Sequence, residues 1–241
     1  MADKKEPVIE TELYLVRHGQ SLGNVGGVTD DDIESREDCV LSPVGENQVR
    51  LLGEHFSQLA LDHILASGMK RAAATAAAVA TRQPENGART VEIHPLLTEC
   101  GISNEYKGKT IGEINSFLGG CAVAAEGTEE YERFIITKGD NDCDETRYAR
   151  ACDFVKYLRA RFNKGEKVLV AAHAAINTYL YFALLGLDWK QSFDPGFCNA
   201  CVTKIVFYKE GTGPFADVAL CYLNDHSHLN SAYPTATFEV L

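Results

Sequence analysis

Two apolar segments of the chain each run directly into residues that can do chemistry. Apolar residues 13–16 are followed by Arg17 and His18, and apolar residues 168–172 are followed by His173. A histidine ring titrates near neutral pH and can attack as a nucleophile, and a neighbouring arginine can hold an anion. A histidine at a strand end can also be only a polar residue where the chain leaves the core. The two histidines therefore mark a candidate catalytic site, with a structural role as the alternative.

The elements that must position these residues alternate between strands and helices. Short apolar runs predict strands at residues 12–16, 63–67, 91–94, 167–171, 202–208 and 218–223. Amphipathic or alanine-rich runs predict helices at residues 42–59, 69–81, 144–162 and 174–185, with short ones near 111–117 and 129–137. This alternation predicts an α/β fold, a three-layer α/β/α sandwich on a mostly parallel central sheet. Ligands bind beyond the carboxyl ends of strands in such sheets, so residues that follow different strands can meet there.

The chain shows no internal repeat and no clear linker, so residues 1–241 are expected to form a single domain. Residues 100–143 are the least regular section and are the candidate for an inserted cap. Residues 91–94 are expected at an edge of the sheet. A turn that contains Gly and Pro joins residues 202–208 to residues 218–223, which predicts a hairpin.

Composition and charge exclude several classes of function. The net charge of −11 argues against a broad nucleic-acid-binding surface, which needs a basic face. No apolar run reaches the roughly 18 residues of a membrane-spanning helix. The N-terminal residues also lack the apolar core of a secretory signal. We therefore expect a cytoplasmic protein without a membrane partner, and its eight cysteines are expected to be free thiols.

Cys198 and Cys201 form a CxxC pair, which is a spacing found in zinc and redox sites. No second pair of ligands lies nearby in the sequence, and residues three apart in a strand point to opposite faces of the sheet. The pair is therefore interpreted as structural.

Four segments together resemble a known family. In chain order they read LVRHGQSLGN, ILASGMKRAAATA, LLTECG and VLVAAHAAIN, and each lies at the expected end of a strand. They resemble the signature blocks of the histidine phosphatase superfamily, which has the phosphoglycerate-mutase-like fold. The segments CNACVTKIVF and LNDHSHL resemble its closing strand and tail, so the likeness spans residues 11–229. The three letters RHG alone are a weak match, but the ordered set is specific.

The resemblance implies a role for each residue in phosphoryl transfer. His18 is implied to be the nucleophile, which forms a phosphohistidine from its neutral ring while the other ring nitrogen donates to a backbone carbonyl. Arg17 and Arg71 are implied to clamp the phosphoryl oxygens, and His173 to donate a further hydrogen bond. Glu99 is implied to protonate the leaving oxygen and then to deprotonate water. The resemblance implies no metal and no other cofactor.

Further residues are candidates for substrate binding. The resemblance adds Ser21, Asn24 and the backbone amide of Ala174 to the phosphate site. Tyr106 and Lys107 lie in the variable segment of the candidate cap, as does Lys109, and the lysines could equally be solvated surface residues.

A second variable segment lies beside the first block. Residues 23–39 are expected to form a loop, and its part from 26 to 39 is strongly acidic with a single arginine. If this loop faced the pocket, it would repel a highly phosphorylated substrate.

Departures from the family pattern argue against two groups within the family. No Asp follows His173, which disfavours the branch that takes its acid from a His-Asp pair, so Glu99 or Glu105 must serve. The segments LGN and ECGISNEYKGK also differ from those of a dedicated glycolytic mutase. Two other histidines, His94 and His228, are candidates for proximity to the pocket.

We therefore predict a metal-independent phosphomonoesterase that acts on a small phosphorylated molecule through phosphorylated His18, with Glu99 as the proton donor. The alternatives are a phosphoglycerate-type phosphomutase and a phosphate-binding regulatory protein of low activity. The sequence does not determine the oligomeric state.

Overall fold

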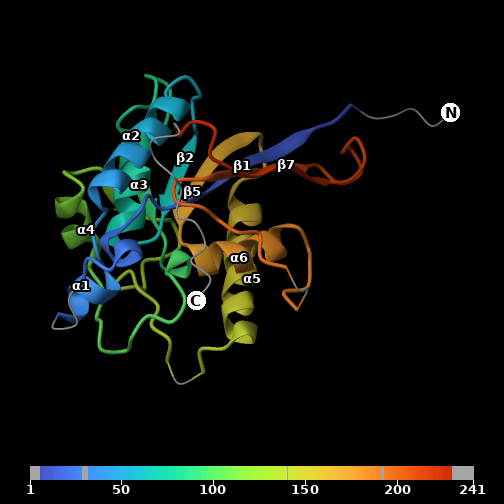
Figure 1. The fold of residues 1–241 in the computed structure, drawn as a ribbon. Helices are drawn as coiled ribbons and strands as arrows, with labels where there is room; N and C mark the ends of the chain where they lie inside the picture. The colour runs from blue at the N-terminus through green and yellow to red at the C-terminus, as the bar shows by residue number, and fades with distance from the viewer. Residues whose placement is uncertain (1–5, 29–31, 140, 191–192, 230–241) are drawn as a thin grey trace.

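A seven-stranded sheet forms the centre of the computed structural model, which describes residues 6–28, 32–139, 141–190 and 193–229. In chain order the strands are β1 (Ile9–Arg17), β2 (His63–Ala66), β3 (Val91–Ile93), β4 (Ala122–Ala124), β5 (Glu166–Ala172), β6 (Val202–Tyr208) and β7 (Val218–Asp225). Across the sheet they lie in the order β4-β3-β2-β5-β1-β6-β7 (Figure 1).

The pairing of the strands brings the two histidine segments together. The strands β4, β3, β2, β5 and β1 are mutually parallel, and β1 pairs with β5 so that Arg17 lies opposite Ala172. His18 and His173 each follow these paired residues, so both emerge at the same carboxyl edge of the sheet. β6 runs antiparallel to β1, and β7 runs antiparallel to β6, which confirms the expected hairpin.

Two layers of helices enclose the sheet (Figure 1). α2 (Pro43–Phe56) and α3 (Lys70–Ala80) pack with one face of the sheet, and α5 (Asp144–Arg161) and α6 (Ala174–Leu184) pack with the other. The shorter helices are α1 (Ile33–Glu37), α4 (Ile111–Phe117) and the 3-10 turns η1 (Leu22–Val25) and η2 (Pro95–Leu97). The three-layer α/β/α sandwich on a mostly parallel sheet is confirmed.

β1 is apolar at successive positions because both of its faces are buried. Leu13 and Leu15 join the core cluster under α5 and α6, whereas Tyr14 and Val16 join the cluster under α2 and α3. A central strand covered on both faces needs apolar side chains on both, so it reads as a continuous apolar run.

Three expectations about secondary structure are wrong. Residues 91–94 are not at an edge, because β4 pairs with the outer side of β3, and β4 has only three residues. Residues 129–137 form no helix, because their backbone bonds to other segments: Phe134 N–H donates to Lys109 O and Ile136 N–H to Thr98 Oγ1. Within residues 23–39, η1 and α1 replace part of the expected loop.

Residues 100–143 are only partly separate from the sheet. β4 lies in this segment and extends the sheet, and Ile114 of α4 is buried in the core beneath it. The division into one domain with an inserted cap stays a prediction.

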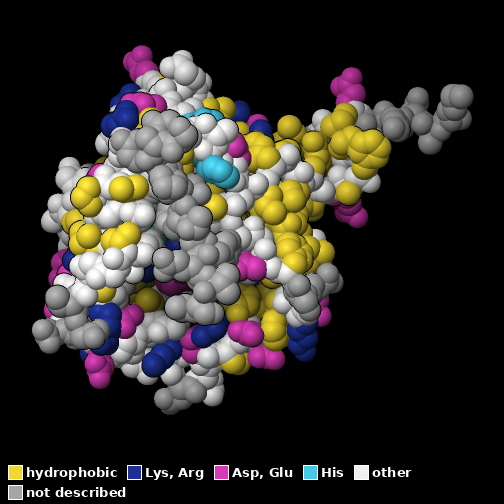
Figure 2. Space-filling view, in the orientation of Figure 1, with side chains coloured by type: hydrophobic (Ala, Val, Ile, Leu, Met, Phe, Trp, Pro, Cys, Tyr) yellow, Lys and Arg dark blue, Asp and Glu magenta, His cyan; other side chains and the backbone are white. Residues whose placement is uncertain are grey.

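An apolar area of the surface lies over part of the sheet. Figure 2 shows apolar side chains gathered over the start of β1 and the β6–β7 hairpin, where Val8, Ile9, Phe215 and Leu220 are exposed. All eight cysteines are free, as expected. No helix in the described part of the chain is long and apolar enough to span a membrane.

One close backbone approach couples α2 to the segment that follows His18. Gly45 lies in the first turn of α2, and a Cβ at this position would lie 1.9 Å from the carbonyl oxygen of Gln20. Only glycine lets the helix approach the segment this closely.

We expect Gly45→Ala to lower the free energy of unfolding by at least about 2 kcal/mol, because backbone must move to admit the methyl group. Gly112→Ala is the matched control, since its Cβ would meet nothing closer than 4.0 Å on an exposed turn of α4. The control should be neutral or stabilising by up to about 1 kcal/mol. Urea denaturation of both variants measures the difference, and equal stabilities would contradict the prediction.

Candidate active site

His18 is held by backbone hydrogen bonds on both of its sides. Its N–H donates to Ala172 O at 2.9 Å, which continues the β1–β5 pairing. Its carbonyl oxygen accepts from Ala200 N at 3.2 Å and from Asn199 Nδ2 at 3.1 Å. The backbone that carries the ring is therefore held by β5 on one side and by the segment before β6 on the other.

The ring of His18 has a defined tautomer. Nδ1 lies 2.7 Å from Gly19 O, and a carbonyl can only accept, so Nδ1 carries the proton. Nε2 then has the free lone pair, and Arg71 Nε donates to it at 3.3 Å. Burial, together with the guanidinium groups of Arg71 and Arg17, holds the pKa of His18 well below its usual value. The ring is thus neutral with its lone pair on Nε2, and its Nδ1 bonds to a backbone carbonyl.

The two arginines reach the same place from different elements. Arg71 lies in the first turn of α3, is almost fully buried, and donates from Nη1 to Glu37 O at 3.0 Å. Arg17 ends β1 and donates from Nη1 to Phe197 O at 2.7 Å. Its buried Nε has no partner among the described residues. Each guanidinium is anchored by a carbonyl and keeps further N–H groups for an anion.

His173 faces His18 at the start of α6. The ring centroids are 5.1 Å apart, with an interplanar angle of 62°. The ring of His173 is fully buried, yet neither nitrogen has a hydrogen-bond partner in the described part of the chain. Burial, with Arg71 as the strongest of the nearby charges, holds its pKa well below the usual value. Buried polar atoms without partners are costly, so this ring is suited to donate to a bound anion.

Glu99 lies at the same helix end. Its carboxylate accepts from the backbone amides of Ala175 at 3.3 Å and Ile176 at 3.0 Å, in the first turn of α6. The partial positive charge of a helix N-terminus favours a carboxylate there. Glu105, the alternative acid, is exposed and makes no side-chain hydrogen bond to the cluster. Glu99 is therefore the carboxyl group that the fold brings beside His173.

Ser21 and Asn24 order the segment after His18. Asn24 Oδ1 accepts from Ser21 N at 3.0 Å, from Ser21 Oγ at 3.1 Å and from Asn199 Nδ2 at 3.3 Å. The orientation of Asn24 directs its amide nitrogen away from these donors. Ala174 is the first residue of α6, so its amide lies at the helix N-terminus beside His173.

Tyr106 and Lys107 contact other parts of the molecule. Tyr106 is buried and donates its hydroxyl to Asp38 at 2.7 Å, whereas Lys107 is exposed and donates to Asn104 O at 3.0 Å. Lys109 Nζ lies 2.7 Å from a Glu34 oxygen. The bonds of Tyr106 and Lys109 connect the candidate cap to residues 32–38, whereas that of Lys107 stays within the cap. Substrate binding by Tyr106 and Lys107 stays a prediction.

The other two candidate histidines lie elsewhere. His94 Nδ1 accepts from Leu96 N, and the ring packs on Phe154 and Tyr157, where burial lowers its pKa to about 4. His228 packs against His55 with ring centroids 5.0 Å apart. Neither ring contacts His18 or His173.

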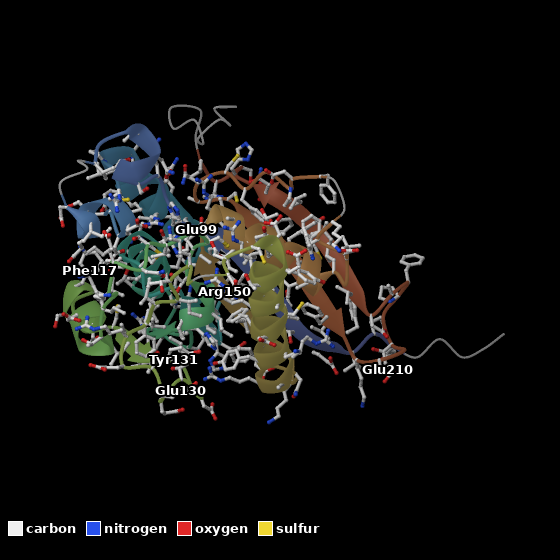
Figure 3. The ribbon with its side chains drawn as sticks, turned by 90° about the horizontal axis from the view of Figure 1, so that it is seen from below. Glu99, Phe117, Glu130, Tyr131, Arg150 and Glu210 are labelled. Carbon is white, nitrogen blue, oxygen red and sulfur yellow. The ribbon has the colours of Figure 1, made fainter. Side chains whose placement is uncertain are left out.

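The sequence analysis missed Asn199 and Arg150. Asn199 bridges His18 O to Asn24, and only its place inside the CNAC segment could have indicated it. Arg150 lies on α5 and, with Glu99, lines a cavity of about 600 Å³ (Figure 3). Nothing in the charged pattern of that helix distinguishes Arg150 from its neighbours.

Comparison with known proteins agrees with this geometry. The family described as histidine phosphatase superfamily (branch 1) matches residues 13–214. The chain is 40% identical over 228 residues to "Putative phosphoserine phosphatase 2" of Hydrogenobacter thermophilus, covering 90% of this chain and 96% of the relative. It is 26% identical over 203 residues to "Phosphoserine phosphatase 1" of the same organism, covering 80% of this chain and 85% of the relative.

A solved structure shares the fold. It is a phosphoserine phosphatase from Entamoeba histolytica in complex with 3-phosphoglyceric acid, with a TM-score of 0.60 and 20% sequence identity. The match covers 91% of this chain and all of the other chain.

We expect His18 and His173 to be neutral at pH 7.5 and to remain neutral as the pH falls through the ordinary midpoint of a histidine, because the pKa of each ring is lowered well below its usual value. Arg71→Met removes a positive charge beside both rings and should raise both titration midpoints. NMR of ¹⁵N-histidine-labelled protein measures the midpoints and the tautomer, with free histidine in the sample as the control. A His18 ring that titrates at its ordinary midpoint, or that carries its proton on Nε2, would contradict the prediction.

Proposed function

The chain belongs to the histidine phosphatase superfamily and is a phosphatase, and from this we propose that it hydrolyses small phosphomonoesters through a phosphohistidine on His18. One observation carries the proposal: the neutral His18 ring has its Nε2 lone pair among Arg71, Arg17 and the unpartnered His173. This is the arrangement that in-line attack on a phosphoryl group needs. Relatives named phosphoserine phosphatase, and a neighbour bound to 3-phosphoglyceric acid, support a small phosphorylated substrate.

In the first step, Nε2 of His18 attacks phosphorus and the bond from phosphorus to the ester oxygen breaks. Arg17, Arg71 and His173 donate to the non-bridging oxygens, whose negative charge is shared among them in the transition state. The acid form of Glu99 gives its proton to the leaving oxygen, so the product is a neutral alcohol. The proton on Nδ1 stays with the ring, and the Gly19 carbonyl stabilises the positive charge that develops there.

In the second step, the Glu99 carboxylate takes a proton from water, and the hydroxide that forms attacks the phosphorus. The bond between phosphorus and Nε2 breaks, inorganic phosphate leaves, and both His18 and Glu99 return to their starting states. The two guanidinium groups supply the positive charge throughout, so the proposal includes no metal and no other cofactor.

We also place the enzyme in the cytoplasm. All eight cysteines are free, and free thiols are typical of a reducing compartment. The net charge of −11 supports a small-molecule substrate in place of a nucleic acid.

Glu99→Gln should lower kcat by about 10²- to 10⁴-fold for alkyl phosphomonoesters, because their leaving oxygen needs a proton. For p-nitrophenyl phosphate the first step should be nearly unaffected, since nitrophenolate leaves without one. The slow second step should then give a burst of nitrophenol equal to the enzyme concentration. Glu105→Gln is the matched control and should behave as the wild type. Equal losses in the rate of the first step for both kinds of substrate, with no nitrophenol burst, would show that Glu99 is not the proton donor.

His18→Ala should abolish hydrolysis and the acid-labile label that ³²P-phosphoserine leaves on the protein. The exposed His226→Ala should keep both. A label that survives in His18→Ala would overturn the proposal. Transfer of phosphate to a second alcohol, without release of inorganic phosphate, would indicate a mutase. Binding of inorganic phosphate without turnover of any phosphoester would indicate a regulatory protein.

A further inference from the structure

A cavity of about 600 Å³ has Glu99 among its lining residues. One wall is residues 136–139 with residues 141 and 142, and the other is the first half of α5. The charged residues of its lining are Glu99, Lys138, Asp142, Arg147, Arg150 and Asp153. Figure 3 shows Glu99 and Arg150 close together beside α5. The volume is that of a site for a small molecule.

The position of Glu99 determines which part of a substrate enters this cavity. The Glu99 carboxylate lies at the first turn of α6, beside His173, and also lines the cavity. A leaving oxygen that takes its proton from Glu99 must therefore lie between the phosphate site and the cavity. The rest of the alcohol then extends into the cavity. This step depends on the function proposed above.

The two arginines that line the cavity differ in their contacts with carboxylates. Arg147 forms a paired contact with Asp142, with Nε to Oδ1 at 3.0 Å and Nη2 to Oδ2 at 2.6 Å, so its charge is neutralised. Arg150 has no carboxylate within 4 Å in the described part of the chain. Its Nη2 contacts Cys100 Sγ at 3.4 Å, and burial raises the pKa of that thiol to about 12, so the sulfur is uncharged.

The uncompensated guanidinium of Arg150 is half-buried and lies at the wall of the cavity. A planar guanidinium binds a carboxylate through two parallel hydrogen bonds. Asp142 and Asp153 line the same cavity, but Asp142 is already paired with Arg147 and Asp153 with Lys156. The single guanidinium of Arg150 then matches a carboxylate, with one negative charge, better than a second phosphate with two.

We infer that Arg150 binds a carboxylate on the alcohol part of the substrate, which makes the substrate the phosphomonoester of a small hydroxy acid or hydroxy amino acid. Arg150 is then the residue that determines specificity, and Arg17 and Arg71 hold the phosphate of any substrate.

Two matched pairs of substrates test the inference, because the members of each pair differ in the carboxylate. They are phosphoserine against phosphoethanolamine, and 3-phosphoglycerate against glycerol 3-phosphate. The wild type should favour the carboxylate member of at least one pair by about 10- to 100-fold in kcat/KM, the usual range for a hydrogen-bonded charge. Arg150→Met should remove this preference by lowering kcat/KM for the carboxylate member alone. Arg150→Lys should retain part of it.

Lys156→Met is the matched control, since Lys156 is an exposed residue of the same helix outside the cavity. Turnover of p-nitrophenyl phosphate, which has no carboxylate, should be retained in Arg150→Met, Arg150→Lys and Lys156→Met, and it shows that each of these variants is folded. If the wild type hydrolyses p-nitrophenyl phosphate through His18 but prefers neither carboxylate substrate, the inference is overturned and the proposed function stands. A preference that survives in Arg150→Met also overturns the inference. Turnover that survives in His18→Ala overturns the proposed function instead.

Discussion

The parallel pairing of β1 with β5 is the constraint on which the site depends. Its register sets Arg17 opposite Ala172, and the ladder continues one step further through the bond from His18 N–H to Ala172 O. Both histidines therefore leave the sheet side by side. A shift of one residue in the pairing would exchange the two faces of β1, so that each apolar side chain would point to the opposite core cluster. Packing in the two core clusters therefore stabilises the observed register.

Burial and nearby positive charge both lower the pKa of His18 and of His173. Removing His18 and His173 from water favours their neutral forms, and Arg71 strengthens the effect on both. A protonated histidine could not attack phosphorus, so in the proposed mechanism the charges that hold the phosphate also keep His18 in its reactive form. The bond from Nδ1 to the Gly19 carbonyl directs the free lone pair to Nε2, beside the guanidinium of Arg71.

Two acidic residues of the segment after His18, Glu34 and Asp38, bond to the candidate cap. Glu34 lies between Lys70 of α3 and Lys109, at 2.6 and 2.7 Å, and the Tyr106 hydroxyl donates to buried Asp38. Burial raises the pKa of Asp38, although the bond from Tyr106 opposes this effect. The acidic side chains of this segment therefore hold two parts of the fold together, and the sequence alone could not show which cations they would meet.

The sequence by itself determined the order of strands and helices, because apolar periodicity and capping act over a few residues. Ser42 caps α2 as its local pattern indicates, and the blocks around His18, Arg71, Glu99 and His173 carry the family likeness. It did not determine β4, which is three residues long and forms only because β3 offers an unpaired edge. Only the tertiary structure places Glu99 and not Glu105 at the N-terminus of α6, and only it leaves Arg150 at a cavity without a carboxylate partner among the described residues. Contacts between residues far apart in the chain determine which carboxylate lies at a helix end and which arginine has a counter-ion. No local sequence pattern contains these contacts.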